Sequence, residues 1–354
     1  MSILDDLEGQ RKLDQQGMLE TIRGLPEQCR QAWRAAHAPD LPPDYSQIDR
    51  IVMLGMGGSA IAGDMLRVLL QRECAIPVFN VRQYDLPPYV DERTLVIASS
   101  FSGNTEETLS AFSQALAKPA KKLAATSGGQ LLTTARANGV PVFTYEFQGT
   151  PRAALGWSLM PLLAIAQRLG LMPGLERDVE EALAIMEELQ EHIGEGVPAA
   201  GNPAKHVAQR LHGRLVVVYG AGILTEVAHR WKTQLNESSK AWCFYEELPE
   251  ANHNAIVGYE LPPDITHSTA VVFLQSDLLH PRVQLRYQFT QRMLEKAGVE
   301  VLTVDGRGQS ALAQMLSAVL FGDYVSYYLA ILNGVDPTPT TVIENLKAWL
   351  AQQG

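Results

Sequence analysis

Cysteine is scarce in this chain of 354 residues, which has only Cys29, Cys74 and Cys243. They lie far apart and form no CxxC pair, which excludes a disulfide framework and a zinc knuckle and fits a reducing compartment. The metal-binding patterns HxH and HExxH are also missing from the sequence. We therefore expect a cytoplasmic protein without a bound metal or cofactor.

Positive charge is in short supply as well: 29 lysines and arginines stand against 39 acidic residues, a formal net charge of −10. An acidic surface repels nucleic acid and anionic lipid, so we expect neither nucleic acid nor a membrane as a partner. The polar N-terminal segment lacks the apolar stretch of a signal peptide. The apolar stretch 157–169 contains Pro161 and falls short of the roughly 20 residues that a membrane span needs.

Hydrophobic residues, at 46%, are plentiful, and charged residues make up 19%, as in compact folded proteins. The length favours two domains. Short apolar segments alternate with helical ones, and strands are expected at residues 50–54, 76–81, 94–99, 122–127 and 140–145. Continuous apolar strands between helices predict a parallel sheet that helices cover on both faces.

The same pattern restarts after residue 200, with strands expected at 214–219, 270–274 and 299–304 and helices at 280–297, 311–332 and 341–352. This repetition predicts a tandem duplication in which Gly55 and Gly220 are equivalent turn positions. We expect N-terminal helices and a first α/β domain at 1–155, a helical connector at 156–200, and a second α/β domain with C-terminal helices at 201–354. Proline and glycine mark a connector at 39–43 and a linker at 194–205.

The strongest local motif is SFSGNT at residues 100–105, directly after an expected strand and before an expected helix. The N-terminus of a helix offers free N–H groups and the positive end of its dipole. Ser100, Ser102 and Thr105 add hydroxyl groups there, and Gly103 allows close approach of the backbone. An ordinary N-cap also uses such residues, but it does not require three hydroxyls, so the motif indicates a phosphate site. The corresponding segment of the second half, LQSDLL at 274–279, lacks this hydroxyl pattern.

A second motif, GMGGSA at residues 55–60, matches the dinucleotide-binding pattern GxGxxA. That interpretation needs an acidic residue about 20 positions later, at the end of the next strand, and none stands there. A close-packed turn between strand and helix, and a turn that faces a sugar through Ser59, are the other two interpretations. The glycine pattern alone leaves all three open.

Five segments together carry a more specific resemblance: GMGGSAIAGD, SFSGNTEETL, TPRAALG, LNES and EANHN, in this order between residues 55 and 254. They resemble the bifunctional phosphoglucose/phosphomannose isomerase family. The resemblance implies two tandem sugar-isomerase (SIS) domains of flavodoxin-like α/β fold. It also implies interconversion of glucose 6-phosphate and mannose 6-phosphate with fructose 6-phosphate through an enediol.

The resemblance assigns roles to individual residues. Glu237, in LNES, matches the base that shuttles the proton, and His253, in EANHN, matches a ring-opening histidine that reaches the neighbouring subunit of a homodimer. Arg152 matches the cation that faces the enediolate, Lys347 resembles a lysine that assists ring opening, and Thr340 is expected near C2–C3 of the sugar. The remaining positions are expected to line the sugar or hold its phosphate: Gly57, Gly58, Ser59, Ser100, Ser102 and Thr105.

Each of these residues also has an ordinary structural explanation. Outside their motifs, Glu237 and Lys347 read as solvated helix residues, His253 as a loop residue bonded to backbone, and Arg152 as a surface cation. One departure from the family pattern is visible: Ala255 follows EANHN, where the family often has an acidic residue.

Three other functions fit the sequence less well. A non-catalytic sugar-phosphate sensor usually carries a helix-turn-helix domain, for which residues 1–47 are too short and too acidic. A nicotinamide-dependent oxidoreductase leaves SFSGNT unexplained. A sugar aminotransferase needs a glutaminase domain with an N-terminal cysteine, which this chain lacks.

Overall fold

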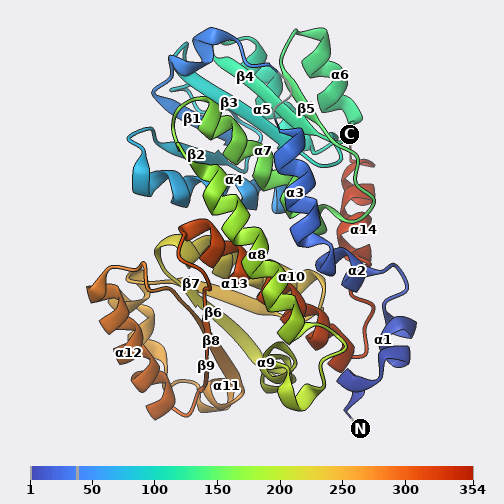
Figure 1. Ribbon diagram of the computed structural model, residues 1–354, viewed down its shortest axis with the longest axis vertical. Helices are drawn as coiled ribbons and strands as arrows, with labels where there is room; N and C mark the ends of the chain where they lie inside the picture. The colour runs from blue at the N-terminus through green and yellow to red at the C-terminus, as the bar shows by residue number, and fades with distance from the viewer. Residues whose placement is uncertain (1, 37–39, 354) are drawn as a thin grey trace. The chain divides into compact units, whose positions relative to one another are not determined.

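The computed structural model describes residues 2–36 and 40–353, which form two compact units (Figure 1). The β1–β5 unit consists of Gly24–Glu187 and Arg307–Ser317. The β6–β9 unit consists of Met1–Arg23, Glu188–Gly306 and Ala318–Gly354. The domain boundaries expected at residues 155 and 200 were placed by the sequence repeat, and they stay a prediction. Pro39, at the start of the expected connector, lies outside the described residues.

The β1–β5 unit is built on a five-stranded parallel sheet of order β2-β1-β3-β4-β5. Every residue of β3 is buried, as expected for a strand with helices on both faces. β2 begins later than expected, after Pro77. The strands are Arg50–Leu54 (β1), Val78–Val81 (β2), Thr94–Ser100 (β3), Lys121–Thr126 (β4) and Val142–Thr144 (β5).

Alternate residues of β1 face opposite layers of helices. Val52 and Leu54 share a buried cluster with Phe112 of α5, whereas Met53 approaches Gly63 of α4 on the other face. The helices of this unit are α3 (Leu25–Ala35), α4 (Gly57–Glu73), α5 (Glu106–Leu116), α6 (Gly129–Ala137) and α7 (Leu155–Arg168), with short 3-10 turns η2 (Pro43–Ser46) and η3 (Pro151–Ala153). The long helix α8 (Leu175–Ile193) continues from this unit into the next.

The β6–β9 unit repeats this topology with four parallel strands in the order β7-β6-β8-β9. The order matches β2-β1-β3-β4, so the predicted duplication and fold class are confirmed. The apolar pattern does not predict β7, because this edge strand is largely exposed and ends on Glu246 and Glu247. The strands are Leu215–Gly220 (β6), Cys243–Glu247 (β7), Thr269–Gln275 (β8) and Glu300–Asp305 (β9).

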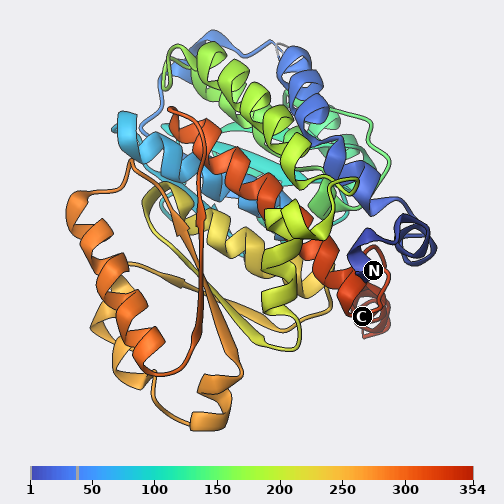
Figure 2. The same ribbon diagram turned by 60° about the horizontal axis from the view of Figure 1, so that its bottom comes forward.

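Helices also cover both faces of the second sheet, with α12 on one side and α10 and α13 on the other (Figure 2). The helices of this unit are α1 (Leu7–Leu13), α2 (Met18–Arg23), α9 (Pro203–Leu211), α10 (Thr225–Glu237), α11 (Pro263–His267), α12 (Pro281–Lys296) and α14 (Thr341–Leu350). Helix α13 (Ala311–Leu332) begins in the β1–β5 unit and belongs to the β6–β9 unit from Ala318 on. Short 3-10 turns include η4 (Ala199–Gly201), η5 (Gly222–Leu224), η6 (Glu250–His253) and η7 (Ala255–Gly258).

Helix α13, which occupies the expected residues 311–332, is a longer apolar segment than 157–169. Among the described helices it alone has the length and composition to cross a membrane. However, 94% of its most apolar window is buried inside the protein, as in the core helix of a folded domain. Length and composition are therefore weak evidence for a membrane span here.

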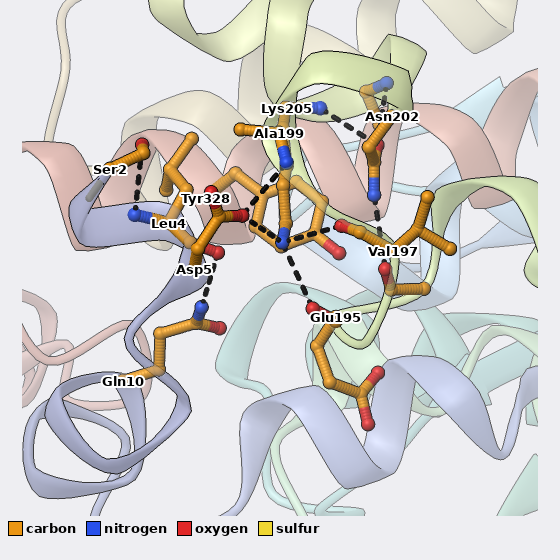
Figure 3. Close-up of polar contacts among 12 residues, drawn as sticks. Ser2, Leu4, Asp5, Gln10, Glu195, Val197, Ala199, Asn202, Lys205 and Tyr328 are labelled. Carbon is orange, nitrogen blue, oxygen red and sulfur yellow. Dashed lines mark hydrogen bonds and ion pairs between the residues drawn. The ribbon is translucent and has the colours of Figure 1, made fainter.

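The segment 194–205, expected as a linker, is a packed part of the β6–β9 unit (Figure 3). Lys205 is fully buried, and its Nζ donates to the Asp5 carboxylate (3.2 Å) and to the carbonyls of Glu195 (2.9 Å) and Val197 (2.8 Å). Burial lowers the pKa of Lys205, and the neighbouring Asp5 carboxylate opposes that shift. The ammonium thus fastens the N-terminal residues and this segment to the start of α9.

We expect Lys205→Met to lower the free energy of unfolding by about 2–4 kcal/mol, because it removes the donor to two carbonyls and the cation that is paired with the Asp5 carboxylate. The matched control is Lys12→Met, which breaks an exposed ion pair with Glu8 (2.8 Å) and should cost no more than about 0.5 kcal/mol. Urea titrations of both variants measure the difference. Equal losses would contradict a structural role for the buried ammonium.

Candidate functional site

The SFSGNT motif forms a loop, here called the hydroxyl loop (residues 100–105), between β3 and α5. The hydroxyls of Ser100 and Thr105 are 2.9 Å apart. The N–H of Gly103 donates to Ser100 Oγ (3.1 Å), and the N–H of Asn104 donates to Ser102 Oγ (3.2 Å). Thr105 stands at the N-cap of α5, yet its side chain makes no capping hydrogen bond. Capping alone therefore does not account for these hydroxyls.

The hydroxyl loop is fixed by the loop that follows the neighbouring strand β4. Gly103 has a φ of +68°, and a Cβ at this position would lie 1.9 Å from the carbonyl oxygen of Gly128. Its carbonyl accepts a hydrogen bond from the N–H of Leu131 (2.9 Å), and the Asn104 side chain accepts one from the N–H of Gln130 (3.0 Å). Only glycine permits this contact, so the two loops hold one shape together.

Aromatic rings pack against the hydroxyl loop. The Phe101 ring lies at 6.2 Å from Tyr145 and 6.3 Å from Phe147, and Tyr145 stacks on Trp157 at 5.6 Å. Burial raises the pKa of Tyr145 to about 12, although a hydrogen bond with Ser158 partly opposes this. Tyr145 therefore stays neutral near pH 7 and acts as packing.

The glycine motif at residues 55–60 lies against the hydroxyl loop. Ser59, the buried third residue of α4, accepts a hydrogen bond at its Oγ from the N–H of Phe101 (3.2 Å). A Cβ on Gly58 would lie 2.8 Å from the carbonyl oxygen of Pro151. Gly58 is therefore required for close packing of the α4 N-terminus on η3, which supports the close-packed-turn interpretation for this glycine.

Arg152 lies in η3 and is 4% exposed, so it is not a surface cation. The chain around it is held by Gln28 of α3, whose side chain donates to the carbonyl of Ala153 (3.0 Å) and accepts from the N–H of Gly156 (2.6 Å). Sequence reasoning missed Gln28, because a glutamine in an N-terminal helix carries no motif. Within the β1–β5 unit the structure gathers seven of the expected site residues: Gly57, Gly58, Ser59, Ser100, Ser102, Thr105 and Arg152.

In the β6–β9 unit, Glu237 is the last residue of α10 and is half-buried. The preceding turns of this helix are anchored on α13. The guanidinium of Arg230 and the amide of Gln234 both donate to the Asp323 carboxylate, at 2.7 and 2.9 Å. The Trp231 indole donates to the carbonyl of Ala318 (2.9 Å). The end of α10, and Glu237 with it, is therefore rigidly placed within this unit.

The other three expected residues of this unit lie outside regular core structure. His253 ends η6 and is exposed, and the adjacent Asn252 is fixed by its hydrogen bonds to Thr290 (2.7 Å) and Arg286 (3.4 Å) of α12. Thr340 is the N-cap residue of α14, and Lys347 lies on that exposed helix. Lys240 bonds the carbonyls of both Glu237 and Pro339, which brings Thr340 close to the end of α10.

The second sheet has no copy of the hydroxyl loop. At the equivalent place, after β8, the loop 274–279 borders a cavity of about 410 Å³. Two carboxylates, Asp277 and Asp305, stand among its lining residues together with amide side chains such as Gln284. Carboxylates repel phosphate, so this cavity does not suit a second phosphate group.

Both the C-terminal part and nearly the whole of this chain match known proteins. The model of the bacterial phospho-glucose isomerase C-terminal SIS domain matches residues 200–350. The bifunctional phosphoglucose/phosphomannose isomerase of Caldicellulosiruptor bescii is 42% identical over 336 residues, which cover 95% of this chain and 99% of that protein. The enzyme of the same name from Aquifex aeolicus is 35% identical, covering 88% and 93% of the two chains.

Among solved structures, a glucose-6-phosphate isomerase like protein from Thermus thermophilus has the same fold. It superposes with a TM-score of 0.65 at 19% identity, covering 97% of this chain and 100% of that chain. Identity of this order supports the fold alone. The relatives from Caldicellulosiruptor and Aquifex match nearly the whole chain at 35–42% identity, and on that ground this chain belongs to the bifunctional phosphoglucose/phosphomannose isomerase family.

Proposed function

We propose that this protein interconverts glucose 6-phosphate and mannose 6-phosphate with fructose 6-phosphate. The observation that carries the proposal is the hydroxyl loop, locked by Gly103 against the next loop and joined to Ser59, in a chain whose family is established. Both full-length relatives named above carry the names of isomerases. Nothing favours the alternative of a non-catalytic sugar-phosphate-binding protein. We also propose a cytoplasmic location, where hexose phosphates and reduced cysteines occur.

The hydroxyl loop is the proposed phosphate site. The hydroxyls of Ser100, Ser102 and Thr105 stand next to the N-terminus of α5, whose free N–H groups favour an anion. Arg152, Gly57, Gly58 and Ser59 lie at the same edge of the sheet and would face the sugar and its developing charge.

The reaction moves one proton between neighbouring carbons of the opened sugar. In the proposed mechanism the Glu237 carboxylate takes the proton from C2 of the aldose. The C2–H electrons form the C1–C2 double bond, and the C1 carbonyl oxygen becomes the negative oxygen of an enediolate. The O2 proton then moves to O1, the C1–C2 double bond supplies the electron pair with which C1 takes back the proton from Glu237, and O2 becomes the ketone oxygen. Glucose and mannose 6-phosphate differ only at C2, so both give the same enediol. The Arg152 guanidinium would stabilise the enediolate oxygens.

Ring opening precedes this transfer. His253 would donate a proton to the ring oxygen, since an imidazole can hold and release a proton at its ring nitrogens. Lys347 would assist, and Thr340 would contact the sugar near C2–C3. We further propose that His253 serves the site of a second copy in a homodimer. The exposed apolar side chains that follow it, Val257 (86% exposed) and Leu261 (75% exposed), support a protein partner for this segment.

Glu237→Gln should lower kcat by about 10²–10⁴-fold, because the amide keeps the shape but cannot accept the proton. Binding of fructose 6-phosphate, measured by calorimetry, should stay within a few-fold of the unmutated protein. The coupled assay is run with EDTA on each aldose, and Glu8→Gln, on an exposed side chain, serves as the control. Turnover near the original rate would remove Glu237 from the mechanism.

Gly103→Ala should weaken fructose 6-phosphate binding by at least about tenfold. The added methyl group would collide with the Gly128 carbonyl and so displace the hydroxyls that are proposed to hydrogen-bond the phosphate. Gly139→Ala is the matched control: its φ is also positive (+65°), but a Cβ there meets nothing within 4 Å. Calorimetry on both variants measures the effect. Equal binding by the two variants would mean that the hydroxyl loop does not hold the phosphate.

Mixing two inactive homodimers tests the shared site. When Glu237→Gln and His253→Ala proteins are dissociated and reassociated in equal amounts, half of the dimers are mixed, and each has one intact site if His253 acts across the interface. The expected activity is about a quarter of the unmutated enzyme at equal total protein. No recovery, with mixed dimers verified by mass spectrometry, would place His253 in its own chain's site.

A further inference from the structure

Lys240, three residues after Glu237, adopts an unusual backbone conformation. Its φ is +55°, and among the described residues it is the only non-glycine one with positive φ. For an L-amino acid this region costs about 1–2 kcal/mol, and glycine would avoid the cost. A lysine at such a position suggests that its side chain has a use there.

The ammonium of Lys240 joins two segments that are far apart in the sequence. It donates to the carbonyl of Glu237 at the end of α10. It also donates to the carbonyls of Pro339 (2.7 Å) and Pro337 (3.5 Å), in the turn that leads to α14. An ammonium has three donors and suits three carbonyl acceptors. The last carbonyls of a helix lack intrahelical partners and carry the negative end of its dipole, so a cation is favoured there.

The turn at residues 336–340 depends on such a donor. Pro337 and Pro339 have no N–H, so this stretch has few backbone donors with which to fasten itself. The neighbouring Ser239 reinforces the same connection. Its hydroxyl donates to the carbonyl of Ser326 (2.6 Å), and its own carbonyl accepts from the Asn333 side chain (2.8 Å). The exit from α10 is thus attached to the end of α13 and to the turn that follows it.

We infer that Lys240 is a positioning residue that sets the place of Thr340, and of the helix that carries Lys347, relative to the Glu237 carboxylate. This inference rests on the proposed function. The ammonium fixes the main chain of Glu237 on one side and the residue immediately before Thr340 on the other. Because proton transfer depends on sub-ångström placement of base and substrate, loosening this link lowers kcat more than it weakens binding.

The test uses two variants that remove the ammonium in different ways. Lys240→Met keeps the side-chain stem, and Lys240→Gly removes the side chain but adopts the positive φ without strain. Both should lower kcat by about tenfold or more, with KM changed less than about threefold. Lys240→Arg, which retains a cationic donor, should keep most of the activity. Lys296→Met, at the end of α12, is the control and should match the unmutated enzyme.

Hydrogen–deuterium exchange of residues 340–350 gives a readout that does not depend on activity. The amides of this segment should exchange faster in Lys240→Met and Lys240→Gly, while those of α10 before Glu237 stay protected. If exchange is unchanged, or if both variants turn over within about twofold of the unmutated enzyme, the inference is wrong. If the unmutated protein shows no isomerase activity, the proposed function is wrong. The hydrogen–deuterium exchange rates of residues 340–350 then still show whether Lys240 holds this segment in place.

Discussion

Two backbone segments in the β1–β5 unit approach each other so closely that no side chain fits between them. Gly103 and Gly128 meet where the loops after β3 and β4 cross, and a single methyl group on Gly103 would reach the Gly128 carbonyl. This contact determines where the hydroxyls of Ser100, Ser102 and Thr105 lie relative to the N-terminus of α5. A loop that is already fixed loses little conformational entropy when it binds an anion, so the affinity of its hydrogen bonds is retained.

Much of the fold could be predicted because its determinants are local. Apolar strands followed by glycine turns and helices indicate the two parallel sheets, and the long, mostly apolar segment 311–332 predicts helix α13 with its observed ends. Strand β7 could not be predicted, because an exposed edge strand lacks the continuous apolar pattern of the inner strands. The glycines and prolines of 194–205 predict a linker, because such residues are common in linkers. In the structure the buried ammonium of Lys205 holds this segment in place by donating hydrogen bonds to its backbone carbonyls.

The candidate site residues also fall into those that the sequence could predict and those that it could not. Hydroxyls and glycines that cluster within a few residues, such as Ser100 to Thr105, are visible as a motif. Residues that hold the site from a distance are not: Gln28 reaches a backbone N–H 128 positions away, and Lys240 reaches carbonyls 97 and 99 positions away. Backbone acceptors carry no sequence signature, so such contacts emerge only from coordinates. The assignment of Glu237, His253, Thr340 and Lys347 comes from family resemblance and remains a proposal.

The burial of Lys205 has a practical consequence for handling this protein. Asp5, the side chain that forms an ion pair with that ammonium, lies 200 positions earlier in the sequence. A substitution of Asp5, or a deletion that removes it, would therefore leave the Lys205 ammonium without its carboxylate inside the β6–β9 unit. Preparations that differ near Asp5 should not be treated as equivalent when their stabilities are compared.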